Sequence, residues 1–237
     1  MKTAVMQPYF FPYMGYFQLI SAVDTFIIFD DVQYINKGWI NRNRLLNDSD
    51  GLLFTVPLKK SSREAFINQR SISEEWTRES QRLLKNIKRI YSSAPYFETV
   101  IELIAEIVRY KEDNLARYVT YSLSLISQHL RIETSFINAS DYSLDDNMKG
   151  GARIIELCKK TNTNHYINPI AGKELYARES FDRSEIKLSF LSPLNIQYKQ
   201  FEAPFVPDLS IIDVLMFNSL EDVSIFLSSY DLISNIN

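Results

Sequence analysis

The stretch TAVMQPYFFPYMGYFQLISAVDTFIIFDDV, at residues 3–32, decides the fold class of this chain. Residues 3–6 form a short apolar segment that favours a strand, and residues 15–23 space their apolar side chains as a buried helix does. Residues 25–32 form a nearly continuous β-branched and aromatic run, which is typical of a strand buried on both faces. Strand, helix and strand in this order indicate a βαβ unit, and therefore a parallel sheet with a right-handed crossover.

The rest of the chain continues the α/β pattern and adds a helix-rich segment in the middle. Residues 34–48 are expected to form a loop or a short hairpin. Further strands are predicted at residues 52–57, 133–138, 165–168, 186–191 and 196–199, and helices at 75–91, 99–110, 115–129, 149–161, 209–218 and 220–230. We therefore expect one α/β domain over residues 1–237, with a parallel-sheet core of nucleotidyltransferase-like (HUP or Rossmann-like) type. A helical insertion is expected at about residues 75–130.

Composition narrows the classes of function. The chain has 237 residues, of which 46% are hydrophobic and 23% charged, with a net charge of −3. This is ordinary globular composition, without the global basic excess that would indicate a nucleic-acid or membrane-surface partner. A single cysteine excludes an intramolecular disulfide and is typical of the reducing cytoplasm, the expected location. No apolar run approaches the roughly 18–20 residues of a membrane helix, and Gln7 and two prolines interrupt the pattern of a signal peptide.

The first candidate motif is FPYMGY at residues 11–16, which follows the first strand and opens the first helix. It resembles the His-x-Gly-His element of class I nucleotidyltransferases and synthetases, with Tyr13 and Tyr16 at the histidine positions and Gly15 between them. The resemblance implies that nucleotide phosphates meet these residues at the positive end of the helix. A tyrosine hydroxyl can donate a hydrogen bond to phosphate but supplies no imidazolium charge. The alternative interpretation is that the rings only fill the core around a tight loop.

The second motif is DDVQYINKGWINRNR at residues 30–44. Asp30 and Asp31 come at the carboxyl end of a predicted parallel strand, where open α/β sheets bind their ligands. Adjacent side chains on a strand point to opposite faces, so both can enter one site only if the strand has already ended. Trp39 offers a stacking face for a sugar or base. Planar polar groups suited to carboxylates, phosphates or sugar hydroxyls come from Gln33, Asn41, Arg42, Asn43 and Arg44. The alternative is a polar surface hairpin.

Weaker signals follow later in the chain. Gly172 and Lys173 come after a predicted strand and could hold a phosphate, but the full P-loop pattern is missing. The segment KGGARII at residues 149–155 is a second glycine-rich entry to a helix; both are more often plain turns. Two histidines and one cysteine lie far apart in the sequence, so no zinc-ligand spacing exists. A cysteine nucleophile would require an exposed Cys158 beside a histidine, and we expect it to lie in the core instead.

Five segments together resemble the WbqC-like family: QPYFFPYMGYFQLI, DTFIIFDDVQYINKGWINRNRL, SAPYF, HYINPIAGKELY and FVPDLSIIDVLMFN. The resemblance extends over roughly residues 3–217. It implies an association with gene clusters for O-antigen and other surface polysaccharides, and a glycine-transferase role has been suggested for the family. Where the family pattern leads us to expect Ser-Gly after Tyr-Ile, this chain has Asn168 and Pro169.

The motifs and the resemblance combine into one hypothesis: a transferase that joins an amino-acyl group, such as glycine, to a nucleotide-linked amino sugar through an ATP-activated carboxylate. ATP and Mg²⁺ are the expected cofactors, and the partner is a small molecule rather than nucleic acid. The catalytic candidates are Asp30, Asp31 and Arg42, and the substrate-binding candidates are Gln7, Tyr13, Gly15, Tyr16, Gln33, Trp39, Asn41, Asn43, Arg44, Gly172 and Lys173. The alternative function is a non-catalytic accessory protein that binds a sugar or nucleotide sugar.

Overall fold

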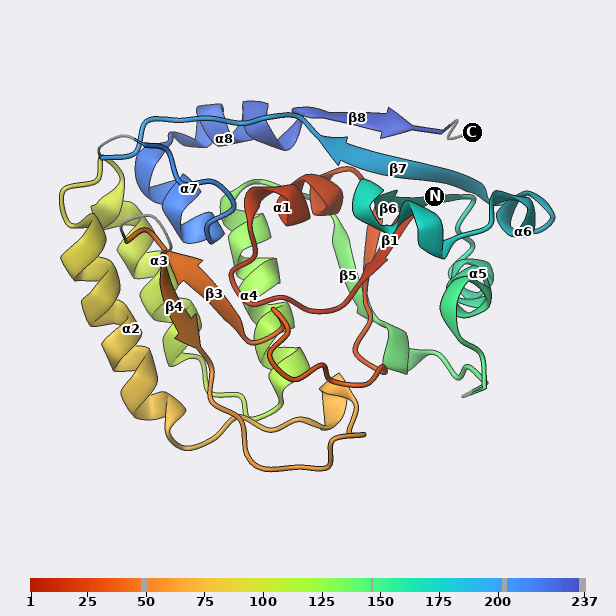
Figure 1. Cartoon of the computed structure of the whole chain (residues 1–237), viewed down its shortest axis with the longest axis horizontal. Helices are drawn as coiled ribbons and strands as arrows, with labels where there is room; N and C mark the ends of the chain where they lie inside the picture. The colour runs from red at the N-terminus through yellow and green to blue at the C-terminus, as the bar shows by residue number, and fades with distance from the viewer. Residues whose placement is uncertain (48–50, 146, 202–203, 235–237) are drawn as a thin grey trace.

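The computed structural model describes residues 1–47, 51–145, 147–201 and 204–234. Within these residues, the main sheet has six strands in the order β5–β2–β1–β6–β7–β8 (Figure 1). All neighbouring strands are parallel except β8, which is antiparallel to β7. The strands are β1 (Lys2–Met6), β2 (Thr25–Ile28), β5 (Ser135–Asn138), β6 (His165–Pro169), β7 (Lys187–Pro193) and β8 (Tyr230–Ile233). This arrangement confirms the predicted α/β class with a parallel, Rossmann-like core.

The opening βαβ unit forms as the sequence predicts. Helix α1 (Met14–Ser21) connects β1 to β2, and Ala4 pairs with Phe26 in parallel register. Strand β2 ends at Ile28, four residues earlier than expected. The chain leaves the sheet because the Asp30 amide donates a hydrogen bond to the Ile28 carbonyl at 3.0 Å. The Asp30 carboxylate accepts hydrogen bonds from Ser140.

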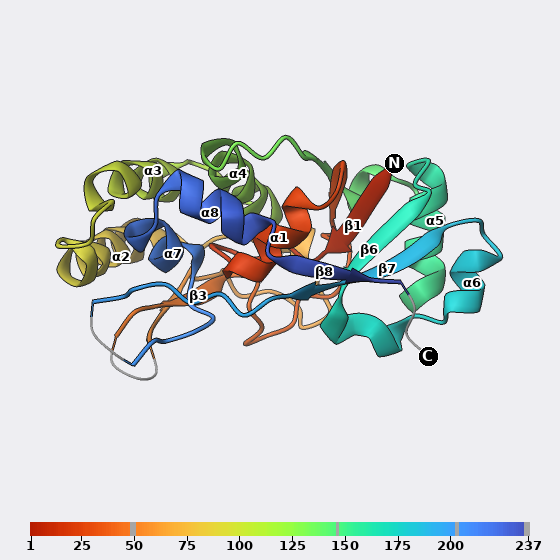
Figure 2. The same ribbon diagram turned by 90° about the horizontal axis from the view of Figure 1, so that it is seen from above.

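Two layers of helices cover the sheet. On one face, Ala4, Phe26 and Ile167 share a core cluster with α1, α4 (Leu115–His129), α7 (Ile211–Phe217) and α8 (Leu220–Leu227). On the other face, Val5 and Ile27 pack with α5 (Gly150–Lys160) and α6 (Arg178–Asp182). Figure 2 shows α5 and α6 on the opposite side of the sheet from α4. The alternation of Ala4 and Val5 between the two clusters is the period-2 pattern of a strand buried on both faces.

The chain between β2 and β5 forms the insertion. It begins with a hairpin of β3 (Arg42–Leu45) and β4 (Leu52–Thr55), which make a separate two-stranded sheet in the described residues. Helices α2 (Trp76–Tyr91) and α3 (Phe97–Arg109) follow, and α4 returns the chain to the main sheet. Apolar side chains of all three helices belong to the same core cluster as α1. The helical segment therefore shares its buried surface with one face of the sheet.

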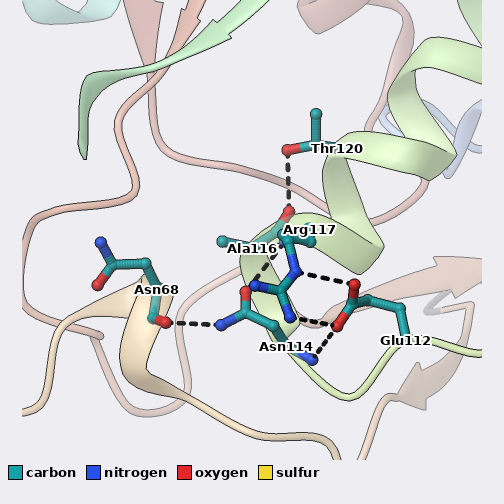
Figure 3. A network of polar contacts seen from close by, with 6 residues as sticks. All are labelled: Asn68, Glu112, Asn114, Ala116, Arg117 and Thr120. Atoms are coloured by element: carbon teal, nitrogen blue, oxygen red, sulfur yellow. Dashed lines mark hydrogen bonds and ion pairs between the residues drawn. The ribbon is translucent and has the colours of Figure 1, made fainter. Parts of the chain in front are cut away.

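A polar network defines where α4 begins (Figure 3). Asn114 precedes the helix, and its side-chain oxygen accepts a hydrogen bond from the Arg117 amide at 3.1 Å. Its amide nitrogen donates to the carbonyl of Asn68, in the 3-10 turn η1 (Ile67–Gln69), at 2.6 Å. Glu112 binds the Arg117 guanidinium through two hydrogen bonds of 2.8 and 2.9 Å. The side-chain cap satisfies a helix donor and joins α4 to the segment that follows the hairpin.

Two predictions near the carboxyl terminus are wrong. Residues 196–199 form no strand, because the side chains of Tyr198 and Gln200 turn toward Asp213. The last helix ends at Leu227 instead of residue 230, and the chain then forms β8. At the end of this helix, the Gln18 side chain donates two hydrogen bonds, one to the Phe226 carbonyl and one to the Ser229 carbonyl. The segment with Gly172 and Lys173, which follows β6, forms the 3-10 helix η3 (Ile170–Leu175). Across the described residues, no helix has the length and apolar character needed to cross a membrane.

A buried carboxylate connects α7 to the helical insertion. Asp213 is fully buried and accepts hydrogen bonds from the Tyr91 hydroxyl at 2.9 Å, the Tyr198 hydroxyl at 2.6 Å and Gln200 Nε2 at 2.8 Å. Burial raises the pKa of Asp213, and the three hydrogen bonds oppose the rise. The Tyr91 hydroxyl also accepts a hydrogen bond from the Leu46 amide. The carboxylate thus joins α7 to Tyr91 at the end of α2 and to the segment that follows β7.

Replacing Asp213 with alanine should destabilise the protein strongly. Three buried donors would lose their acceptor, and each unsatisfied group costs about 1–3 kcal/mol. We expect the free energy of unfolding, measured by urea titration, to fall by roughly 3 kcal/mol or more. Tyr198→Phe removes only one of the three hydrogen bonds and should cost about 1 kcal/mol. Equal losses for the two variants would contradict the shared-acceptor interpretation.

Candidate functional site

The site lies where the order of the strands changes direction. Strand β1 pairs with β2 on one side and with β6 on the other, so the connections diverge from β1. Open α/β sheets bind ligands beyond the carboxyl ends of their strands at such a switch point. Residues 7–13 leave β1 at this edge, and residues 29–31 leave β2 beside them. Both sequence motifs therefore start at the edge where a ligand is expected.

Tyr9 brings the two motifs together. Its ring centroid lies 6.4 Å from that of Tyr13, 5.9 Å from that of Tyr16 and 6.2 Å from that of Trp39. Burial is the main cause of a raised pKa for Tyr9, and the nearby Arg44 opposes it. Tyr9 was not among the predicted site residues. The sequence showed six aromatic residues within residues 7–20, but no local pattern separated the ring at the centre of the cluster from those in the core.

Hydrogen bonds to backbone carbonyls hold residues 7–13 in a conformation that is unusual for non-glycine residues. Phe11 has a left-handed φ of 46°, a conformation that costs about 1–3 kcal/mol at a non-glycine residue. Its carbonyl accepts hydrogen bonds from Asn43 Nδ2 at 2.5 Å and Ser210 Oγ at 2.9 Å, and the Pro12 carbonyl accepts from the Ile211 amide. Phe10 and Phe11 are fully buried, whereas Tyr9 and Tyr13 are only partly buried. The rings of Phe10 and Phe11 therefore fill the core, whereas the ligand contact of Tyr13 stays a prediction.

The first turn of α1 places Tyr13 at the surface and Tyr16 inside. A Cβ atom on Gly15 would lie 2.5 Å from Cε2 of Tyr13, so the tyrosine ring packs directly over the glycine. Burial and then the charge of Asp208 raise the pKa of Tyr13. Tyr16 is 3% exposed, and its hydroxyl donates to the Gln7 carbonyl at 2.7 Å. The predicted phosphate contact of Tyr16 is therefore wrong, because its hydroxyl is used inside the fold.

Successive side chains along β3 point to opposite faces, and this separates the arginines of the second motif from its asparagines. Arg42 and Arg44 lie on the same face of the strand, and their guanidinium carbons lie 5.7 and 5.8 Å from the centroid of Trp39, which is 47% exposed. Asn41 and Asn43 are buried on the other face. Asn41 donates to the Val56 carbonyl at 2.7 Å. The predicted substrate roles of Asn41 and Asn43 are therefore corrected to roles in holding the hairpin and the loop.

The two aspartates follow the end of β2 and have different partners. Asp30 accepts hydrogen bonds from the Ser140 amide at 3.0 Å and the Ser140 hydroxyl at 2.7 Å. Burial raises the pKa of Asp30, against the effect of these bonds. Asp31 forms a buried ion pair with Arg153 of α5. The described residues include no group of three or more acidic, histidine or cysteine side chains that could hold a metal ion. Both carboxylates thus already have partners within the fold, Ser140 for Asp30 and Arg153 for Asp31.

The remaining predicted residues lie outside the contacts around Tyr9. Gln33 is exposed and donates to the Arg63 carbonyl at 3.0 Å. Gly172 packs against the side chain of Asn168, and Lys173 is exposed in η3. Because η3 directly follows β6, these two residues occupy the other side of the switch point from Tyr13. Gln7 directly follows β1 and is partly buried.

A cysteine nucleophile does not fit the structure. Cys158 is fully buried in α5, and burial raises the pKa of its thiol to about 12. His165 pairs with the Ser189 hydroxyl at 2.8 Å. The thiol therefore belongs to the core beneath the sheet, as the sequence predicts.

Comparison with known proteins supports the resemblance seen in the sequence. The chain matches the model of the WbqC-like protein family over residues 7–225. It is also similar to an uncharacterised protein of Mycobacterium tuberculosis, with 31% identity over 225 residues, which cover 92% of this chain and 93% of that protein. No solved structure gives a significant match. The matched region includes the loop after β1, the hairpin and α7.

Gly15→Ala should have different effects on stability in the wild type and in a Tyr13→Ala background. In the wild type the new methyl group displaces the Tyr13 ring, so the free energy of unfolding should fall. In a Tyr13→Ala background the clash is gone, and alanine should be neutral or stabilising by up to about 1 kcal/mol, because glycine is a poor helix former. Urea unfolding of the four proteins measures the coupling. The same effect in both backgrounds would show that the ring does not rest on Gly15.

The Cys158 thiol should be almost unreactive in the folded protein. A rise in its pKa from the ordinary 9.0 to about 12 lowers the thiolate fraction at pH 8 by roughly a thousandfold. Reaction with a chromogenic disulfide reagent at pH 8 should therefore be slower by at least that factor than in denaturant. The single cysteine makes the signal unambiguous. Fast labelling of the native protein would contradict the buried position.

Proposed function

Because the chain belongs to the WbqC-like protein family, we propose that it is a transferase of surface polysaccharide biosynthesis that binds a nucleotide-linked sugar at the carboxyl edge of its sheet. Family membership indicates a role in polysaccharide-related biosynthesis. The single cysteine is a free thiol, which accords with the cytoplasmic location that the sequence predicts.

The group formed by Trp39, Arg42 and Arg44 carries this proposal. Two guanidinium groups lie near one exposed indole ring, which itself packs beside Tyr9. An aromatic face can stack on a sugar or a base, and arginine is the side chain best suited to bind phosphate through two hydrogen bonds. Arg42 uses its Nε to bind the Gly38 carbonyl at 2.9 Å, which orients the group. Among the described residues, no acceptor binds its terminal nitrogens, so they are available to a diphosphate.

The finer proposal is that the protein forms an amide between an amino acid, such as glycine, and the amine of the nucleotide-linked sugar. ATP first converts the carboxylate to an acyl phosphate or an acyl adenylate, with release of ADP or pyrophosphate. The sugar amine then attacks the acyl carbon, the C–N bond forms, the bond to phosphate or AMP breaks, and the amine loses a proton. Tyr13 and the start of α1 are the proposed contacts of the phosphates, with Gly172 and Lys173 on the other side of the switch point. The hydroxyl of Tyr13 is protonated at neutral pH, as in any tyrosine of ordinary or raised pKa, and can therefore donate to phosphate.

Calorimetric titration with UDP-glucosamine and, separately, with ATP tests this function. We expect the wild type to bind the nucleotide sugar, and Arg42→Ala to weaken binding by about 10–100-fold, because a charge-assisted hydrogen bond is worth roughly 1.5–3 kcal/mol. Arg89→Ala is the matched control, since Arg89 is exposed at the end of α2, away from this edge. No binding by the wild type, or equal binding by both variants, would overturn the proposal.

A second candidate is an accessory protein that binds the nucleotide sugar without chemistry. The engagement of Asp30 by Ser140 and of Asp31 by Arg153 favours it, because both carboxylates already have partners. A mixture of ATP, glycine and UDP-glucosamine separates the two functions. An enzyme would release AMP or phosphate and give an amide detectable by mass spectrometry, and Arg42→Ala would abolish this turnover. An accessory protein would bind and give no product.

A further inference from the structure

A cavity of about 240 Å³ opens beside Tyr13, at the carboxyl end of β7. The first turn of α1 forms one wall, and residues 193–198 and 205–209 form the others. A larger cavity of about 940 Å³ lies among the end of α1, residues 130–134 and α8, at the opposite edge of the sheet. The smaller cavity thus adjoins the candidate site and the larger one does not.

The charge in this cavity is negative. Asp208 is the one charged side chain in its described lining, which contains no lysine, arginine or histidine. No cationic side chain of the described residues lies within 4.0 Å of the Asp208 carboxylate. Its charge contributes to the raised pKa of both Tyr9 and Tyr13, which places it close to the aromatic cluster. The carboxylate is therefore open to a cation from outside the chain.

A second acceptor in the lining lacks a donor. Gln18 is fully buried, and its Nε2 donates to the Phe226 and Ser229 carbonyls, each at 2.8 Å. These two bonds determine which way the amide faces, and they leave Oε1 buried without a hydrogen-bond partner. A buried acceptor that lacks a donor costs about 1–3 kcal/mol. Gln18 belongs to the lining of the cavity, and a ligand N–H group that reached Oε1 would remove this cost.

Aromatic rings complete the cavity. Tyr198 and Phe205 meet edge to face, with centroids 5.1 Å apart, and Tyr13 lies in the opposite wall. The hydrogen bond from the Tyr198 hydroxyl to Asp213 holds that ring in place. Aromatic faces attract ammonium groups, so this lining is complementary to an organic cation and repels an anion.

From these three observations we infer that the cavity binds the primary ammonium group of a small substrate, through the Asp208 carboxylate and Gln18 Oε1. The inference rests on the proposed function for the source of that amine, which is either an amino sugar or an amino acid. Tyr13 belongs both to the cavity and to the cluster with Tyr9 and Trp39. The amine is therefore held next to the edge at which the nucleotide part binds.

Protein-detected NMR titrations with glucosamine and with glycine test the inference and distinguish the two sources. N-acetylglucosamine and N-acetylglycine are the matched probes without an ammonium group. We expect one of the two amines to bind the wild type and its acetylated form to bind at least tenfold more weakly. Asp208→Asn should weaken binding of the amine by the same factor. Asparagine suits this position because Asp208 has a φ of 54°, which asparagine tolerates. Glu102→Gln, on the exposed side of α3, removes one negative charge elsewhere and should have no effect.

The outcomes separate this inference from the proposed function. Binding of UDP, which carries no amine, should be weakened about 10–100-fold in Arg42→Ala and unchanged in Asp208→Asn. If an amine binds through Asp208 but UDP-glucosamine and UDP do not bind, the proposed function fails and the cation site stands. If neither amine binds the wild type, or if Asp208→Asn and Glu102→Gln bind the amine equally, the cation site is overturned.

Discussion

The carbonyl oxygen of Phe11 joins three parts of the chain on which the whole site depends. It accepts one hydrogen bond from Asn43 in the hairpin and one from Ser210 at the start of α7. Tyr13 lies two residues after this carbonyl, and Arg42 and Arg44 flank Asn43. Asp208 lies two residues before Ser210. Tyr13, Arg42, Arg44 and Asp208 therefore lie on segments that these two hydrogen bonds hold together. Without the bonds, the left-handed conformation of Phe11 would be unstable.

The edge of the sheet has two regions of opposite charge that meet at Tyr13. On one side, Arg42 and Arg44 lie beside Trp39 and favour an anionic, planar ligand. On the other side, Asp208 and the unpartnered oxygen of Gln18 favour a cation. A nucleotide-linked amino sugar carries both kinds of group, and so does a phosphate-bearing molecule that meets an amino acid. The neutral Tyr13 hydroxyl between the two regions can hydrogen-bond without favouring either charge.

The carboxylates behind this edge hold the fold together. Asp30 joins the end of β2 to Ser140 after β5, and Asp31 joins the same turn to Arg153 in α5. Asp213, in α7, accepts one hydrogen bond from α2 and two from the segment after β7. Burial raises the pKa of Asp30 and Asp213, so each carries an electrostatic cost that its hydrogen bonds offset. Side chains that looked catalytic in the sequence are thus used to connect strands and helices.

The sequence by itself determined the α/β class, the opening βαβ unit and the helical insertion, because the spacing of apolar residues reports local burial directly. It also placed both candidate motifs at one edge of the sheet, since both follow predicted strands. The tertiary structure decided which polar residues face outward. Asn43 and Tyr16 turn inward, and Tyr9 and Asp208 join the site, because their partners lie far away in the chain or on another element. The partners of Gln18, for example, are 208 and 211 residues away. Local periodicity shows whether a side chain is buried, whereas its hydrogen-bond partner depends on how distant segments pack against it.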